Sequence, residues 1–373
     1  MSGAPATTPL TMTAAIARRG QPFTLETCEL AAPGPGEVRL RVLACGICHT
    51  DLAVRDHDLG TTLPAVLGHE GVGVIEALGA GVDEFAIGDR VLVSFSACGD
   101  CGKCRAGAPG YCRHAARGFR GLRADGSSPV SLHGQAITGH FFAQSSFASH
   151  AVAATTSMIR LAPDLPPALM APLACGVQTG MASVMIALAA HAGDRVAIFG
   201  CGGVGLAAVM AARIVGCREI IAVDIRPERL ALARELGATQ VIDSSREDAG
   251  KALRALGGAT RALDCTGLPD VIRTAFNALD SQGVLACAGV SKPGSKLELD
   301  LGALLYSGRS IRGTIEGDAA PREFIPRMIA WYREGRLPLE KLVTAYAFTD
   351  INRAVDDMLA ARVVKPVLIM HES

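Results

Sequence analysis

A glycine-rich loop at residues 200–205, of sequence GCGGVG, constrains the fold of this chain more than any other segment. The loop follows an apolar stretch with the length of a buried strand, and it opens an apolar helical pattern. Gly200 permits a tight turn, Gly202 lets a pyrophosphate approach the backbone, and Gly205 allows close packing of helix on strand. A strand, a glycine loop and a helix in this order predict a dinucleotide-binding unit.

The segments around this loop alternate between short apolar stretches and helical patterns, which is typical of a doubly wound parallel sheet. One predicted helix begins with Pro227 and stops before Gly237, which are favourable residues at those two positions. The predicted strands are 195–199, 219–223, 240–242, 262–265, 284–287 and 310–314. The predicted helices extend from the glycine loop to about 215, over 227–236, up to about 257, and over 269–279.

An acidic residue, Asp224, ends the second predicted strand about 20 residues after the loop. Its carboxylate can bind both hydroxyls of a ribose and would repel a 2′-phosphate, so NAD is favoured over NADP. Arg226 lies close by and favours the opposite preference. The main-chain N–H groups of Gly203 and Val204 lie at the helix start, where the helix dipole favours phosphate oxygens. The competing interpretation is a glycine turn in an α/β domain that binds no nucleotide.

Four cysteines, Cys98, Cys101, Cys104 and Cys112, follow one another in the spacing C-x2-C-x2-C-x7-C. Four thiolates in such a short segment can enclose one tetrahedral ion, which predicts a structural zinc site. A redox-active CxxC pair is a weaker interpretation, because it leaves the third and fourth cysteines unexplained. Iron is chemically possible in place of zinc, although nothing in the sequence favours it.

The remaining segments and the composition limit the other possibilities. Residues 36–95 alternate short apolar stretches with glycine and predict β-structure, whereas 1–11 predict a loose tail. A helix is expected over 321–331 and a last strand over 367–370. The formal net charge is zero, which gives no electrostatic reason to expect binding to nucleic acid or an anionic membrane. Without a recognisable secretion signal, the twelve cysteines favour thiols and metal over disulfides, and we expect a cytoplasmic protein.

Several motifs occur together in an order and spacing that characterise one family. They are CHTD at 48–51, GHEGVG at 68–73, CGDCGKC at 98–104, CGVQTG at 175–180 and GCGGVG at 200–205. Over nearly its whole length the chain resembles the zinc-dependent medium-chain alcohol dehydrogenases. Within that family it is most similar to bacterial aryl-alcohol (benzyl alcohol) and geraniol dehydrogenases. This closer similarity rests on FFAQSSFASH at 141–150, EGDA at 316–319 and KPVL at 365–368.

The resemblance implies a second zinc ion, which is catalytic and is held by Cys48, His69 and Cys175. Three protein ligands leave a fourth position open for chemistry. Asp51 and Glu70 match acids that lie behind the ligands, and Asp51 is expected to orient His69. The implied reaction is a reversible, zinc-assisted hydride transfer from an alcohol to NAD, with two zinc ions per chain.

The same resemblance implies further roles near the cofactor. Thr50 matches the hydroxyl that accepts the substrate proton, and His49 matches a contact to the cofactor pyrophosphate. Arg229 resembles a basic residue near the adenosine ribose, and Lys365 one near the phosphates. One position departs from the pattern, because Ala53 replaces a histidine that continues the proton relay in many members.

The substrate implied is a primary aromatic or allylic alcohol, oxidised to its aldehyde. Phe95 and Phe141 lie where family members line the substrate channel, and Phe142 and Val290 are further candidates. One alternative is a glutathione-dependent formaldehyde dehydrogenase of the same fold, for which arginines after the cysteine cluster could bind the glutathione carboxylate. These are Arg113, Arg117, Arg120 and Arg123. A second alternative is a nucleotide-binding protein without catalytic activity.

The expected architecture is an α/β chain of two domains. A GroES-like, β-rich catalytic domain would combine residues 1–176 with 316–373 and carry the zinc lobe at about 96–113. A Rossmann domain with a doubly wound parallel sheet would occupy 177–315 and bind NAD, and the family arrangement places the active site between the domains. The expected partners are a small-molecule alcohol or aldehyde and further copies of the chain, in a homodimer or homotetramer paired through the sheet edge around 284–314.

Overall fold

The structure, a computed structural model, describes residues 8–370 and divides into two compact units. The first unit contains the described residues up to Cys175, together with Ala320–Ala330 and those from Pro338 onward. The second unit contains Gly176–Ala319 and Trp331–Leu337.

The second unit is built on a sheet of six parallel strands in the order β13-β12-β11-β14-β15-β16. The strand order reverses between β11 and β14, so the prediction of a doubly wound parallel sheet is confirmed. The strands are β11 (Arg195–Phe199), β12 (Glu219–Asp224), β13 (Gln240–Asp243), β14 (Ala259–Asp264), β15 (Leu279–Cys287) and β16 (Ser310–Gly313).

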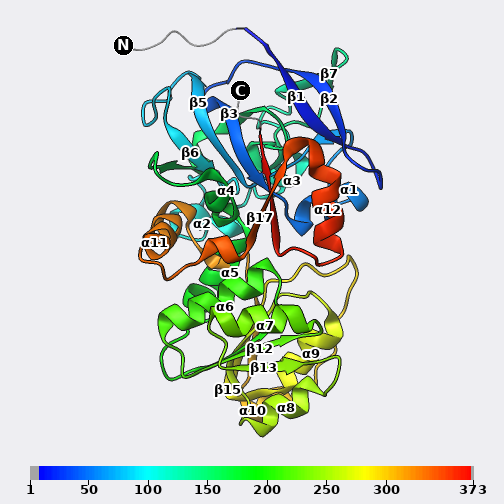
Figure 1. The fold of residues 1–373 in the computed structure, drawn as a ribbon, viewed down its shortest axis with the longest axis vertical. Coiled ribbons are helices and arrows are strands. Elements are labelled where there is room, and N and C mark those ends of the chain that lie inside the picture. The colour runs from blue at the N-terminus through cyan, green and yellow to red at the C-terminus, as the bar shows by residue number, and fades with distance from the viewer. Residues whose placement is uncertain (1–7, 371–373) are drawn as a thin grey trace. The chain divides into compact units, whose positions relative to one another are not determined.

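Helices cover both faces of this sheet. Helices α6 and α7 lie on one side of the strands, and α8, α9 and α10 lie on the other (Figure 1). Their bounds are α6 (Gly203–Val215), α7 (Pro227–Leu236), α8 (Ala249–Ala255), α9 (Pro269–Asn277) and α10 (Leu301–Ser307), and α5 (Gly176–Ala182) packs against α6. Helix α7 has the predicted limits, with Pro227 in its first turn and Gly237 at positive φ after its end.

Several predicted boundaries in this unit are wrong. Helix α9 ends at Asn277, and β15 begins at Leu279, five residues before the predicted strand. The exposed polar residues 280–282 hide the start of the strand from an apolar pattern, although Leu279 before them is buried and paired with Ala259. Strand β14 likewise begins at Ala259 and ends at Asp264, one residue before the predicted end.

The first unit contains two sheets, in agreement with the predicted β-rich character. One has the order β4-β1-β2-β7-β8, and the other has the order β10-β6-β5-β3-β18-β17 with β9 paired to β3. The first sheet is made of β1 (Leu10–Ala17), β2 (Thr24–Leu30), β4 (Ala65–Val66), β7 (Val130–Leu132) and β8 (Gln135–Ile137). The second is made of β3 (Glu37–Gly46), β5 (Gly71–Leu78), β6 (Arg90–Val93), β9 (His150–Ala154), β10 (Met158–Leu161), β17 (Val343–Ala347) and β18 (Lys365–Ile369).

Helices connect these strands and close the unit. They are α1 (His49–Asp56), α2 (Gly102–Arg105), α3 (Ala116–Arg120), α4 (Pro167–Met170), α11 (Pro321–Arg333) and α12 (Ile351–Leu359). Residues from β1, β2 and α12 share one buried apolar cluster that includes Ile16, Leu30 and Val355. This cluster ties the C-terminal segment to the N-terminal sheet.

The predicted tail at 1–11 is wrong where it can be compared. Residues 1–7 lie outside the described residues, but β1 begins at Leu10, pairs with β2 and β4, and buries Met12, Ala14 and Ile16. Among residues 8–370 no single helix is long and apolar enough to span a membrane. The bent pair Pro167–Ala174 and Gly176–Ala187 meets the requirement only when its parts are taken together. All twelve cysteines, which lie within that range, are free thiols.

Candidate active site

Three expected zinc ligands of the first unit lie together although they are far apart in the sequence. Cys48 immediately precedes α1, two residues after the end of β3, and His69 precedes β5. Cys175 follows a short helical turn at 171–174. One ligand atom from each of these residues, and one from Glu70, lie within 4.8 Å of one another. Two thiols and one imidazole at this spacing fit a zinc ion with three protein ligands.

The carboxylate of Asp51 fixes two parts of this cluster. His69 Nδ1 lies 2.9 Å from Asp51 Oδ1, and Asp51 Oδ2 accepts a hydrogen bond of 3.0 Å from the main-chain nitrogen of Cys48. Oδ1 also accepts from the nitrogen of Gly68 at 3.1 Å. Because the buried carboxylate of Asp51 accepts a hydrogen bond from Nδ1–H of His69, Nε2 is left as the metal-binding nitrogen.

Glu70 and Lys365 form a buried ion pair beside the ligands. Lys365 Nζ donates to Glu70 Oε1 at 2.6 Å and to the carbonyl oxygen of Ile47 at 2.9 Å. Burial raises the pKa of Glu70 to about 7, although the charge of Lys365 favours the ionised form. A Cβ at Gly46 would lie 2.0 Å from Glu70 Oε2, so only glycine leaves room for this carboxylate. In this structure Lys365, expected near the cofactor phosphates, is held by Glu70.

Three side chains expected to act in catalysis or cofactor binding lie at the start of α1. A hydrogen bond with Cys175 lowers the pKa of Cys48 well below the usual range, which favours the thiolate that binds metal. The hydroxyl of Thr50 lies 3.6 Å from Cys48 Sγ. His49, the first residue of α1, is exposed.

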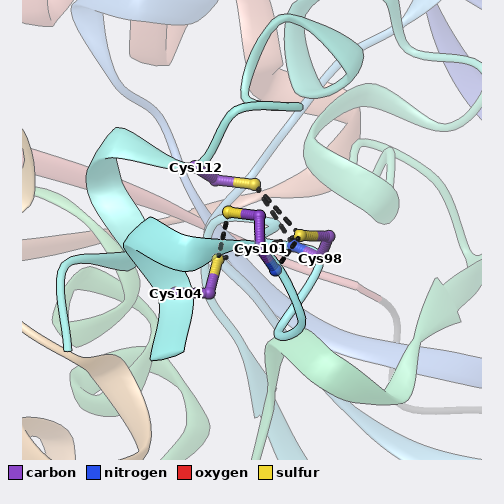
Figure 2. Close-up of side chains that lie close together, drawn as sticks. All are labelled: Cys98, Cys101, Cys104 and Cys112. Atoms are coloured by element: carbon purple, nitrogen blue, oxygen red, sulfur yellow. Dashed lines mark hydrogen bonds between the residues drawn. The ribbon is translucent and has the colours of Figure 1, made fainter. Parts of the chain in front are cut away.

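The four clustered cysteines bring their sulfur atoms together around one point (Figure 2). Sγ–Sγ distances are 3.5 Å for Cys101–Cys104, 3.5 Å for Cys98–Cys112 and 3.9 Å for Cys98–Cys104. A tetrahedral ion with Zn–S bonds of about 2.3 Å requires sulfur atoms about 3.8 Å apart. The cluster therefore fits a closed four-thiolate zinc site.

The glycine loop joins β11 to α6 in the second unit. Gly200 has a φ of +91°, and a Cβ at Gly205 would lie 1.8 Å from the carbonyl oxygen of Gly200. A Cβ at Gly202 or Gly203 would meet no protein atom within 4 Å. The protein's own backbone thus requires glycine at positions 200 and 205. At Gly202 the free space fits the approach of a phosphate group to the backbone.

Asp224 lies at the end of β12, beside the loop. Its Oδ2 accepts a hydrogen bond of 2.6 Å from the main-chain nitrogen of Cys201, and Oδ1 accepts one of 2.9 Å from that of Arg226. Arg229 is half-buried on α7, and its charge interacts with Asp224. The carboxylate thereby links the glycine loop to the following turn.

Aromatic rings surround His69 on one side. The ring centroid of Phe142 lies 5.1 Å from that of His69 at an interplanar angle of 36°, and Phe141 meets His69 edge-on at 5.8 Å. Phe141, expected to line the substrate channel, is fully buried, and its ring packs edge-on against those of Phe142 and Phe119. Phe95 is also buried, and Val290 in the second unit is 73% exposed.

Sequence reasoning missed Gln144 and the pairing of Glu70 with Lys365. Gln144 has no exposed surface, and it hydrogen-bonds both sides of the segment that contains His69. A glutamine two residues after a pair of phenylalanines is the only local signal of Gln144. The partners of Lys365 lie about 300 positions away in the chain, and no short motif connects them.

A doubly wound parallel sheet with a glycine loop, a cluster of two cysteines and a histidine, and a cluster of four cysteines together define a zinc-dependent oxidoreductase. Residues 34–162 match the alcohol dehydrogenase GroES-like domain, and residues 203–334 match the zinc-binding dehydrogenase domain. The chain belongs to the zinc-dependent medium-chain alcohol dehydrogenase family.

Individual relatives agree with this membership. A geraniol dehydrogenase of Castellaniella defragrans is 40% identical over 95% of this chain and 97% of its own length. The crystal structure of an alcohol dehydrogenase zinc-binding domain protein from Burkholderia ambifaria is 44% identical, with a TM-score of 0.95 over 98% of this chain and 100% of that chain. Benzyl alcohol dehydrogenase from Acinetobacter calcoaceticus is 38% identical, with a TM-score of 0.94 over 97% and 100%.

Proposed function

We propose that this protein catalyses the reversible oxidation of a primary aromatic or allylic alcohol to its aldehyde, with NAD and zinc. The observation that carries the proposal is the position of the Phe142 ring. It packs beside His69, which belongs to the cluster of two thiols and one imidazole. The similarity to a geraniol dehydrogenase and a benzyl alcohol dehydrogenase supports the same class of substrate.

Cys48, His69 and Cys175 would hold the catalytic zinc, and the four clustered cysteines would hold a second, structural zinc. When bound at the open site, zinc supplies a Lewis acid that polarises the alcohol oxygen, while NAD accepts the hydride. Asp51 keeps His69 in the tautomer that offers Nε2. The hydroxyl of Thr50, next to Cys48, would receive the proton that leaves the alcohol.

The second unit would bind NAD at the glycine loop. The open space at Gly202 accommodates a phosphate, and α6 directs its positive end toward it. Asp224 would accept hydrogen bonds from the ribose hydroxyls and repel a 2′-phosphate. Arg229 would contribute positive charge near the adenosine ribose, and His49 would contact the cofactor pyrophosphate. Asp224→Ser should therefore raise kcat/KM with NADP relative to NAD, and an unchanged ratio would argue against this role.

Initial rates of NAD reduction with benzyl alcohol, geraniol, ethanol, and formaldehyde plus glutathione test the proposed substrate class. We expect kcat/KM for benzyl alcohol or geraniol to exceed that for ethanol by about 10- to 100-fold, as contacts of a few apolar groups provide. Equal values for benzyl alcohol and ethanol would remove the aromatic preference. Metal analysis should find about two zinc ions per chain. A protein without bound zinc would contradict the proposed zinc-dependent activity.

A preference for the formaldehyde–glutathione adduct would move the function to formaldehyde detoxification. The exposed arginines Arg113, Arg117 and Arg120 keep this second candidate in the test. Arg123 is a weaker candidate for binding glutathione, because its Nε and Nη2 already donate hydrogen bonds to the two carboxylate oxygens of buried Glu37.

We also propose that the protein is a homodimer or homotetramer. Strand β16 pairs only with β15 among the described strands and forms one edge of the sheet. The neighbouring helix α10 exposes Leu301, Leu305 and Tyr306, of which Tyr306 is 91% exposed. Light scattering coupled to size-exclusion chromatography measures the number of chains, and a monomer would refute this expectation.

A further inference from the structure

Gln144 makes an unusual set of contacts behind the proposed catalytic site. Its side chain is fully buried, and its Oε1 accepts hydrogen bonds from the nitrogen of Gly71 at 3.0 Å and from the hydroxyl of Ser146 at 2.8 Å. Its Nε2 lies within hydrogen-bond distance of the carbonyl oxygens of His69 (2.9 Å), Val93 (3.1 Å) and Ser94 (3.2 Å). One amide therefore joins the segment of a metal ligand to the end of β6, next to Phe95.

The backbone around Gln144 is strained. Phe142, Ala143 and Ser145 all have positive φ, of 48°, 59° and 56°, which is unfavourable for residues with a Cβ. Such a turn persists only when surrounding contacts hold it. The Ser145 hydroxyl donates to the carbonyl oxygen of Val66 and accepts from the nitrogen of Phe141. Main-chain bonds from Ser146 to Gly68 (2.8 Å) and from Phe147 to Leu67 (2.9 Å) anchor the chain after the turn. The Gln144 side chain adds bonds from within the turn to His69 and Gly71.

The consequence of this turn is the position of the Phe142 ring. Phe142 is half-buried, and its ring packs at 5.1 Å from His69, 5.0 Å from Phe119 and 4.7 Å from Phe141, centroid to centroid. Because Phe141 is fully buried, Phe142 is the ring of this pair that keeps exposed surface beside the histidine. A shift of the turn would move this ring relative to His69.

We propose that Gln144 is a positioning residue that determines substrate specificity by holding the strained turn and thereby fixing the Phe142 ring beside His69. This inference rests on the proposed alcohol dehydrogenase function. Aromatic and allylic alcohols would benefit from the fixed ring because flat, unsaturated groups pack well on it. Short aliphatic alcohols reach too few atoms to benefit in the same way.

The test compares Gln144→Met with a matched variant elsewhere in the first unit. Methionine has nearly the length of glutamine and removes all the hydrogen bonds. Asn352 is a suitable control site, because its amide also bridges main-chain groups, accepting from the nitrogen of Phe23 and donating to its oxygen, each at 2.8 Å. Asn352→Leu thus removes an equivalent pair of amide contacts without touching the aromatic rings or the metal ligands.

For Gln144→Met we expect the ratio of kcat/KM for benzyl alcohol to that for ethanol to fall about tenfold, mainly through KM for benzyl alcohol. Zinc content should stay at the wild-type value, and Asn352→Leu should leave the ratio unchanged even if it lowers the melting temperature. In combination with Phe142→Ala, Gln144→Met should cause no further loss in the ratio, because both act through the same ring.

Several results would overturn the inference. The inference fails if Gln144→Met leaves the ratio unchanged or if Asn352→Leu lowers it equally. It also fails if the losses of Gln144→Met and Phe142→Ala add in the double variant. Loss of zinc from Gln144→Met would instead assign Gln144 to the metal site. If that variant does not fold, Ser146→Ala, which removes one bond to Oε1, should show a smaller fall in the same ratio, and no fall would refute the role. A wild-type protein inactive on every alcohol would reject the proposed function itself.

Discussion

The removal of one charge behind His69 tests the proposed catalytic zinc site most directly. Asp51→Asn keeps the size of the side chain and replaces one carboxylate oxygen by an NH2 group. In the structure the two oxygens accept three hydrogen bonds, from His69 Nδ1, Gly68 N and Cys48 N. An amide has one accepting oxygen, so at least one N–H must face another donor in this fully buried place.

The size of the effect follows from these contacts. A hydrogen bond to a charged group is worth about 1.5–3 kcal/mol, and the carboxylate also stabilises the positive charge shared by the metal and His69. That energy corresponds to a fall in zinc affinity of about 10- to 100-fold. Because the four-cysteine site does not contact Asp51, only one of the two proposed zinc ions should be weakened.

The assay is dialysis against graded concentrations of a chelator, followed by measurement of zinc per chain and of alcohol oxidation. The zinc content of Asp51→Asn should fall from about two to about one per chain at a chelator concentration that leaves the wild type intact. Asp264→Asn is the matched control. Asp264 is also a fully buried carboxylate with three hydrogen bonds, from the nitrogen and hydroxyl of Thr266 and the nitrogen of Gly267, but it touches no ligand.

The reasoning is refuted if Asp51→Asn retains both zinc ions at every chelator concentration that the wild type withstands. Equal loss of zinc from Asp264→Asn would also refute it, because general destabilisation would then explain the result.

Three further expectations concern stability. Cys104→Ser should remove about one zinc per chain and lower the melting temperature in calorimetry, since structural zinc contributes to folding; full zinc content would contradict the four-thiolate site. Gly180→Ala should cost about 1–3 kcal/mol in urea unfolding, because its Cβ would lie 2.0 Å from a main-chain oxygen of α6; a neutral result would show that α5 can move away. A hydrogen bond from Arg18 lowers the pKa of Glu26 to about 2. The ionised Glu26 therefore stabilises the folded protein at pH values above the usual carboxyl pKa, and this stabilisation is lost as the pH falls toward 2. Glu26→Gln should therefore lower the free energy of unfolding by about 0.5 kcal/mol at neutral pH, and a deficit that persists in acid would contradict this explanation.

The sequence by itself predicted the features that local spacing encodes. The doubly wound sheet follows from short apolar segments, from Pro227 and Gly237 at the two ends of one helix, and from the glycine loop. The four-cysteine cluster follows from a spacing short enough for one loop to enclose an ion. Polar residues inside strand β15 defeated the same reasoning, because an apolar pattern cannot report pairing that depends on neighbouring strands.

The tertiary structure decided which distant residues meet, because burial and hydrogen bonding across the fold have no signature in local spacing. It paired Lys365 with Glu70 and left Phe142, rather than Phe141, with exposed surface beside His69. It also gave Gln144 main-chain partners on two separate segments, which a buried amide must find to offset its loss of water.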